Sequence, residues 1–325
     1  MLLRRALSVS AVVVAGVVVS ACATKPEVKN LSDYGVYQCG QLDLKVAGVE
    51  ESGLLGIEYL NRRVLLKPSL TDEGALYVAP GDTQTRFWAK GERATLTLKG
   101  NALPECLEPG AIESSFKAMG TEPNWSAEIE NNRMDLTLPY DGDVLEGVWL
   151  RETVANRHGR VYEGKVNDRE IEVSVAHQLC ENPMSGAQYP AQVRLTVDGN
   201  TFEGCGGDRE RLFQGAEWIV EDLAGDGIID RSMMTIRFHD EGRISGRASC
   251  NRYMGSYSLT GENLTFSQMG STMMACHESL MNQEQKFLTL MSDVVSGHIG
   301  RHGELLLETQ SGDTIKAFKS DTENP

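Results

Sequence analysis

Alternation of apolar and polar residues recurs along most of the chain. Residues 94–98, 134–138, 171–175 and 193–197 each place an apolar side chain at every second position, with Gly, Asn, Asp or Pro between the runs. A period of two with such turn residues is typical of antiparallel strands that bury one face. The pattern predicts a mainly β fold, built from small antiparallel barrels or sheets in tandem.

One stretch near the C-terminus departs from this alternation. Between residues 278 and 295 the apolar side chains follow helical spacing, and Gly297 comes after them. The spacing predicts one amphipathic helix. We interpret its methionines as core-filling side chains rather than ligands. The apolar positions are Leu280, Met281, Phe287, Leu288, Met291, Val294 and Val295.

The first residues predict export and lipid anchoring. Arg4 and Arg5 precede an apolar run over residues 6–19, too short to span a membrane stably, and Val-Ser-Ala-Cys22 follows. This ending resembles the lipobox of bacterial lipoproteins, which implies removal of residues 1–21 and acylation of Cys22. Residues 22–33 would then form a polar tether. Ala23 after the cysteine implies the outer membrane, with the folded part in the periplasm; the alternative is ordinary secretion with an unmodified cysteine.

The negative net charge of the chain argues against nucleic acid as a partner. The formal charge is −15, and loss of Arg4 and Arg5 from the 31 basic residues leaves 29 against 46 acidic ones, or −17. Binding of nucleic acid through phosphate neutralisation is therefore not expected. Residues 108–208 hold 8 basic and 18 acidic side chains, so the acidity belongs mainly to the middle of the chain.

Six cysteines remain beside Cys22, and they fall into neighbouring pairs. Fifteen connectivities are open, and we favour sequential pairing because each pair lies within one candidate domain: residues 34–107, 108–208 and 209–325. Such bonds suit an oxidising compartment. The alternative is a zinc site, since His177 and His277 lie near cysteines, but no Cys-x-x-Cys accompanies them, so neither metal nor cofactor is expected. The predicted pairs are Cys39 with Cys106, Cys180 with Cys205, and Cys250 with Cys276.

The first domain contains four motifs in order: Tyr37-Gln38-Cys39, Gly74-Ala75-x-Tyr77, Phe87-Trp88-Ala89-Lys90-Gly91 and Cys106. Together they resemble the MliC family of inhibitors of c-type lysozyme. This resemblance implies a small barrel closed by one disulfide, with a loop that enters the lysozyme cleft. In that family a serine before the glycine, and the lysine of the Trp-x-Lys-Gly motif, meet the two catalytic carboxylates of the enzyme.

The implied lysozyme-binding residues here are Lys90, Glu73, Gly74 and Tyr77. Lys90 keeps the ammonium that would form charge-assisted hydrogen bonds with a carboxylate pair. Glu73 replaces the serine, and a carboxylate facing two carboxylates is repelled or must take up a proton. Residues 80–85 also predict a longer loop than is usual in the family. The alternative for Lys90 is a solvated lysine on a barrel strand.

Two further resemblances cover the rest of the chain. Residues 120–125, Gly-Thr-Glu-Pro-Asn-Trp, and the later Cys180 and Cys205 resemble an uncharacterised envelope-lipoprotein domain with a Gly-Thr-Glu-Pro-Phe-Trp signature. From about residue 213 the chain resembles the META or HslJ type, on Trp218, Cys250-Asn251 and residues 271–276, Ser-Thr-Met-Met-Ala-Cys. The META resemblance implies a link with envelope stress rather than a known reaction.

These observations favour a non-enzymatic envelope lipoprotein that protects against lysozyme. Nucleophile elbow, zinc-protease, phosphate-loop and cofactor motifs are missing from the sequence, and Glu122 and Ser185 have no recognisable base beside them. The expected partners are c-type lysozyme and, through Cys22, a lipid bilayer. The alternative function is an envelope-stress or structural binding protein of the META kind without lysozyme inhibition.

Overall fold

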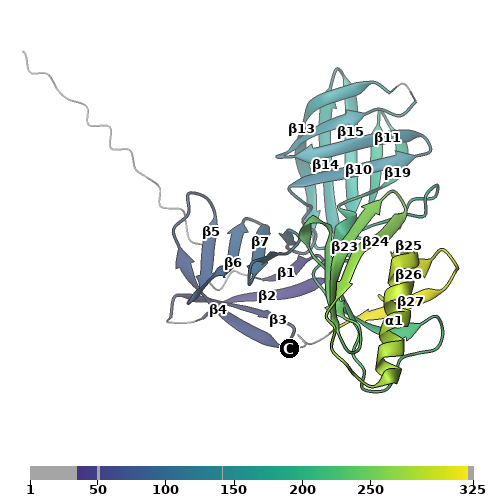
Figure 1. The fold of residues 1–325 in the computed structure, drawn as a ribbon. Helices are drawn as coiled ribbons and strands as arrows, with labels where there is room; N and C mark the ends of the chain where they lie inside the picture. The colour runs from purple at the N-terminus through teal and green to yellow at the C-terminus, as the bar shows by residue number, and fades with distance from the viewer. Residues whose placement is uncertain (1–34, 50–51, 141, 321–325) are drawn as a thin grey trace, which may run out of the picture.

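The computed structural model describes residues 35–49, 52–140 and 142–320; Cys22, the predicted signal peptide and the predicted tether lie outside the described residues. Figure 1 shows three β units in series, each an antiparallel sheet closed on itself. The prediction of mainly β barrels in tandem with one helix is confirmed. Within the described ranges, no helix has the length and apolar character needed to cross a membrane.

The first barrel closes through two strand pairings. Strand β6 pairs with both β5 and β7, and β1 pairs with both β2 and β9, so the sheet forms a ring. The predicted disulfide Cys39–Cys106 joins β1 to β9. The strands are β1 (Val36–Cys39), β2 (Leu42–Val49), β3 (Leu54–Tyr59), β4 (Arg62–Ser69), β5 (Ala75–Ala79), β6 (Asp82–Lys90), β7 (Arg93–Leu98), β8 (Asn101–Ala102) and β9 (Cys106–Leu107).

Successive turns of this barrel lie at opposite ends, because each strand runs antiparallel to the next. The turns after β1, β3, β5 and β7 share one end, and those after β2, β4 and β6 share the other. The longer loop expected over residues 80–85 is wrong: only Pro80 and Gly81 separate β5 from β6. Asp82 stabilises this tight turn by accepting hydrogen bonds from Gln84 N (3.0 Å) and Thr85 Oγ1 (2.6 Å), and the Thr85 bond lowers the pKa of Asp82.

The second barrel carries the Gly-Thr-Glu-Pro-Asn-Trp segment as the hairpin between β10 and β11. Gly120 pairs with Trp125, whose buried indole lies so close that a side chain at position 120 would collide with it. Glu122 lies in the turn. Cys180–Cys205 ties β16 to β19. The strands are β10 (Ser115–Thr121), β11 (Asn124–Glu130), β12 (Arg133–Thr137), β13 (Val144–Asn156), β14 (Gly159–Val166), β15 (Arg169–Ala176), β16 (Cys180–Glu181), β17 (Gln188–Tyr189), β18 (Ala191–Val197) and β19 (Asn200–Gly206).

The third barrel contains the helix, which lies between β24 and β25. Helix α1 (Glu278–Asp293) buries Phe287 and Met291 completely, so these predicted apolar positions face the core. The strands are β20 (Glu217–Leu223), β21 (Thr235–Phe238), β22 (Arg243–Arg247), β23 (Arg252–Thr260), β24 (Asn263–Ser271), β25 (Val294–Ile299), β26 (Leu305–Thr309) and β27 (Thr314–Lys319); the 3₁₀ helices are η2 (Arg209–Leu212) and η3 (Asp240–Gly242).

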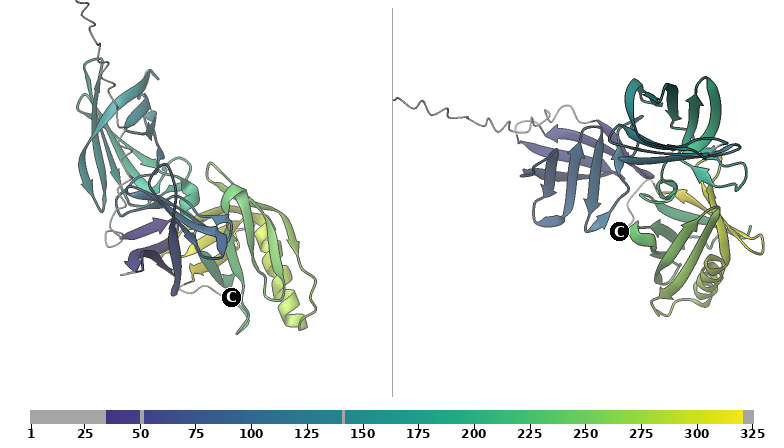
Figure 2. Two further views of the ribbon diagram at one scale, coloured as in Figure 1. Left: turned by 90° about the vertical axis from the view of Figure 1, so that its left-hand side faces the viewer. Right: turned by 90° about the horizontal axis from the view of Figure 1, so that it is seen from above.

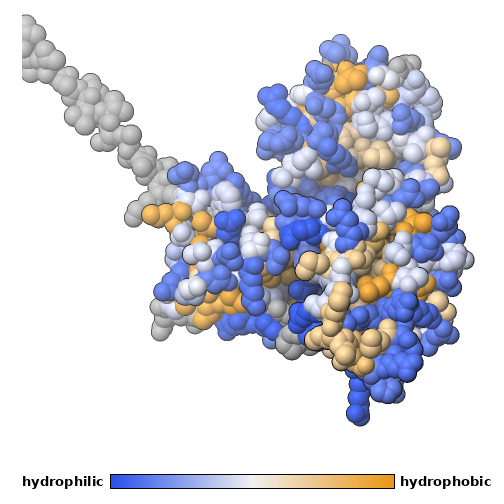
Figure 3. Space-filling model, in the orientation of Figure 1, coloured by the Kyte–Doolittle hydropathy of each residue, from blue (hydrophilic) through white to orange (hydrophobic). Residues whose placement is uncertain are grey.

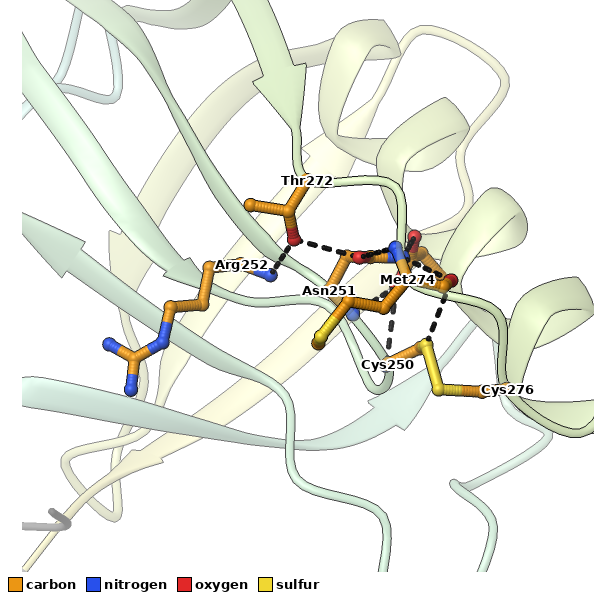
Figure 4. Close-up of a disulfide and its surroundings, with 7 residues drawn as sticks. Cys250, Asn251, Arg252, Thr272, Met274 and Cys276 are labelled. Atoms are coloured by element: carbon orange, nitrogen blue, oxygen red, sulfur yellow. Dashed lines mark hydrogen bonds between the residues drawn. A yellow bond between two sulfur atoms is a disulfide. The ribbon is translucent and has the colours of Figure 1, made fainter.

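Asn251 organises the start of β23 beside the third disulfide, Cys250–Cys276 (Figure 4). Its Oδ1 accepts hydrogen bonds from Thr272 Oγ1 and Met274 N, both at 2.7 Å. Its Nδ2 donates to the buried carboxylate of Glu284 on α1 at 2.9 Å, and Glu284 also accepts from the backbone N of Asn251. The Cys-Asn pair thus has a structural role, since Asn251 links α1 to the sheet.

The three barrels are grouped around one junction (Figures 1 and 2). Arg211 of η2 contributes to this junction through its buried side chain. Its side chain is 8% exposed and donates to Glu105 O and Gln38 O of the first barrel. Its Nε lies 3.4 Å from Glu113, just before the second barrel. One guanidinium therefore contacts both the first barrel and the segment that leads into the second, and its planar set of donors suits such a position.

Close backbone approach also fixes the first barrel against the third. Gln41 N in the turn after β1 donates to Gln214 O at 2.8 Å. Gly215 adopts φ +95°, and a Cβ at this position would lie 2.2 Å from Cys39 O. Glycine is required here because any side chain would push the two barrels apart.

Candidate functional site

The loop between β4 and β5, residues 70–74, and the end of β6 lie side by side at one end of the first barrel. Ala75 pairs with Ala89, which brings Gly74 next to Lys90. Leu70 is 99% exposed, so an apolar side chain projects from the same loop. The structure therefore brings three of the four predicted site residues, Glu73, Gly74 and Lys90, together on an accessible surface.

Lys90 forms two contacts within this surface. Its Nζ lies 3.2 Å from Glu73 Oε2 and 3.9 Å from the centroid of the Trp88 ring. The Trp88 indole donates to Glu73 O at 2.9 Å, and Thr71 Oγ1 donates to the same oxygen at 3.0 Å. The loop backbone is thus fixed against β6, and the ammonium is held at a defined place above an aromatic ring.

Gly74 permits the close approach of the loop to β6. It adopts φ +66°, and a Cβ there would lie 2.3 Å from Ala89 O. Tyr77, the fourth predicted residue, is 1% exposed and belongs to the barrel core, where it is paired with Phe87 of β6 in the strand register. In this structure Tyr77 supports β5 from inside and is not part of the accessible surface.

The ion pair between Lys90 and Glu73 is exposed, with 46% and 76% of the two side chains accessible. Exposed pairs contribute about 1 kcal/mol or less, because water competes for both charges. The ammonium can therefore exchange Glu73 for another carboxylate at low cost. The sequence indicated repulsion by Glu73, but the spacing gave no sign that Glu73 and Lys90 pair with each other.

A second ion pair, which the sequence did not predict, stabilises the hairpin that carries Lys90. Glu92, in the turn between β6 and β7, bonds to Arg160 on β14 of the second barrel. Arg160 is 6% exposed and also lies 3.2 Å from Glu152. The middle barrel thus fixes the position of the hairpin. Residues 68 positions apart gave no local pattern that could have revealed this contact.

The described part of the chain thus consists of three antiparallel barrel units, each with one internal disulfide, and the first carries an exposed lysine beside a short loop. Residues 37–104 match the family model of the membrane-bound lysozyme-inhibitor of c-type lysozyme, MliC. Residues 211–322 match the META domain. Both resemblances predicted for the two ends of the chain are confirmed, and neither match covers the middle barrel.

Among solved structures, three similar chains are a protein from Burkholderia xenovorans, a second protein studied by NMR, and a DUF4847 family protein from Bacteroides vulgatus. Their sequence identities are 24%, 23% and 15%, and their TM-scores are 0.29, 0.30 and 0.28. The matches cover 34%, 34% and 36% of this chain and 85%, 95% and 100% of those chains. Among curated proteins none matches this chain.

Proposed function

We propose that the protein protects the bacterial envelope by binding c-type lysozyme through the loop at residues 70–74 and Lys90. The observation that carries the proposal is the exposed ammonium of Lys90, held beside this loop in a domain that matches the MliC family. An ammonium placed between two catalytic carboxylates removes the acid and base functions that glycoside hydrolysis needs. The direct test is inhibition of c-type lysozyme by the soluble protein that begins after Cys22.

The junction leaves this end of the barrel open to an enzyme. The turn after β1, at the opposite end, is the one that meets the third barrel through Gln41 and Gln214. The turn after β6 contacts the second barrel through Glu92, but Glu73 and Lys90 retain exposed side chains. The enzyme would thus approach the loop beside the second barrel, and the third barrel would lie behind the site.

Glu73→Ser is expected to tighten lysozyme binding by about three- to tenfold. In the free protein Glu73 competes for the ammonium of Lys90, and in the complex it would face the enzyme's carboxylates. The substitution removes both effects. Inhibition constants against c-type lysozyme would be compared for the wild type, Glu73→Ser and Glu58→Gln.

Glu58→Gln serves as the matched control, because Glu58 is an exposed carboxylate on the same barrel that pairs with Arg63 instead of Lys90. A gain of affinity in both variants would trace the effect to total charge. If Glu73→Ser bound lysozyme with unchanged or lower affinity, this would refute competition between Glu73 and the enzyme's carboxylates for the Lys90 ammonium.

We also propose that Cys22 carries the lipid that holds the protein at the outer membrane. Several acyl chains give stable attachment without a spanning segment. Cys22→Ser should move the protein from the membrane fraction to the soluble periplasmic fraction, as measured by immunoblotting of separated fractions. Mass spectrometry of the wild type should show acylation at Cys22; membrane retention of the serine variant would contradict the anchor.

A further inference from the structure

A cavity of about 450 Å³ lies between the first and third barrels, remote from the lysozyme loop. Its walls include the turns after β3, β5 and β7, which share the end of the first barrel opposite to the loop at residues 70–74. Phe238, the last residue of β21, and His239, which follows it, close the cavity from the third barrel. Domain interfaces and barrel mouths are common places for small-molecule sites of this size.

The apolar part of the wall belongs mainly to the first barrel. Leu60, Val64, Leu98 and Leu103 line the cavity; these side chains pack against the barrel core yet remain only half-buried. Phe238 of the third barrel, which is 2% exposed, faces the same space. An apolar ligand segment placed here would cover side chains that the protein itself leaves partly open to water, and such burial is favourable. In the view of Figure 3, hydrophilic residues cover most of the surface, and apolar patches interrupt it on all three barrels.

The charged part of the wall has a sign opposite to that of the whole protein. Four basic side chains, Arg62, Arg63, Lys99 and Arg237, line the cavity with two acidic ones, Asp82 and Glu217. Burial lowers the pKa of His239 to about 4, so this imidazole is neutral near pH 7. The lining therefore carries a net charge of +2 in a chain of −15.

The acidic side chains of the wall are engaged by the protein. Asp82 is bonded to its own turn, and Glu217 lies 3.3 Å from Arg237 through one oxygen. Among the basic side chains, Arg237 is occupied by Glu217, and Arg63 pairs with Glu58. Lys99 is therefore the cation that would meet an anionic group on a ligand, in a cavity that excludes part of the solvent and strengthens the attraction.

We propose that this cavity binds a single-chain anionic amphiphile of the fatty-acid class. Its hydrocarbon chain would lie against Leu60, Val64 and Leu98, and its carboxylate would lie beside Lys99. The ligand would contact both barrels, so binding would also stabilise their junction. This site goes beyond lysozyme inhibition and is independent of it, since Lys90 is at the other end of the barrel.

Calorimetric titration of the soluble protein that begins after Cys22 tests the site. Dodecanoate, used below the concentration at which it forms micelles, should bind saturably with one site per chain. Butanoate, which has the carboxylate without the chain, and dodecyltrimethylammonium, which has the chain with a positive head, should each bind at least about tenfold more weakly.

Variants localise the binding. Lys99→Glu should weaken dodecanoate binding by about tenfold or more through charge reversal, and Val64→Phe should abolish it by filling the cavity. Lys67→Glu is the matched control, because Lys67 is an exposed lysine on β4 outside the cavity; it should change the affinity less than about twofold. Circular dichroism and thermal unfolding would check that each variant is folded.

Three results would overturn the proposal: no saturable binding of dodecanoate, equal binding of the cationic amphiphile, or equal weakening by Lys99→Glu and Lys67→Glu. Lysozyme inhibition by Lys99→Glu should stay at the wild-type level, so failure here is distinguishable from failure of the inhibitor function.

Discussion

Lys90→Ala is expected to weaken binding to c-type lysozyme by about 2 to 5 kcal/mol, mainly through faster dissociation. The substitution removes the ammonium and leaves the two catalytic carboxylates of the enzyme facing each other without a counter-charge. It should cost little stability, because the Lys90–Glu73 pair is exposed. Surface plasmon resonance would give the dissociation rate, and an inhibition assay the affinity.

Lys67→Ala is the control for this result, since it removes an exposed lysine from the same barrel outside the loop. Lys90→Arg keeps the charge over Trp88 but changes the shape of the cation, and we expect it to bind with intermediate affinity. Equal dissociation rates for wild type and Lys90→Ala would mean that Lys90 has no place in the complex.

Arg211→Ala is expected to destabilise the junction by about 3 to 5 kcal/mol, because removal of one member of a buried ion pair leaves the other charge uncompensated. The side chains of Arg211 and Glu113 are 8% and 11% exposed. Two backbone carbonyls of the first barrel, Glu105 O and Gln38 O, also lose their donor. Differential scanning calorimetry should show a lower transition temperature and earlier unfolding of at least one barrel.

Arg243→Ala provides the comparison for the junction. Arg243 pairs with Asp240 on the surface of the third barrel, where the arginine side chain is 52% exposed, so its loss should change stability by less than about 1 kcal/mol. If Arg211→Ala unfolded no earlier than Arg243→Ala, the barrels would be held together by other contacts.

Local patterns in the sequence were sufficient to predict the fold class. The alternation of apolar and polar residues, as in residues 94–98, is a local property of one strand. The structure forms β7 (Arg93–Leu98) where this alternation predicts a strand. The helical spacing of Phe287 and Met291 likewise reports burial on one face, and α1 buries both. The sequential cysteine pairs could be predicted because each pair closes within one repeating unit of strands.

The candidate site was only partly predictable. The family motif located Lys90 and Glu73, but no local rule pairs side chains 17 positions apart, and their ion pair follows from the register of β5 and β6. Tyr77 belongs to the same motif and is buried, because motif membership does not separate core residues from surface ones. The composition of residues 80–85 predicted a long loop, yet the Asp82 side chain stabilises a two-residue turn.

Contacts between barrels could not be predicted from the sequence. Arg211, Gly215 and Arg160 have no distinctive neighbours along the chain, and their roles depend on surfaces that meet only after each barrel has folded. The cavity between the first and third barrels could not be predicted for the same reason, since its basic residues come from separate turns and strands.

The most direct test of lysozyme binding through the loop at residues 70–74 and Lys90 is an inhibition titration. The soluble protein would be titrated into c-type lysozyme at low salt and at physiological salt. Long-range attraction between charges is screened beyond about 8 Å at physiological salt, whereas contacts within a cleft are screened much less. We predict one-to-one inhibition that persists at physiological salt and is lost in Lys90→Ala. Inhibition that disappears when salt is raised, or that is the same in wild type and Lys90→Ala, would contradict lysozyme binding through the loop at residues 70–74 and Lys90.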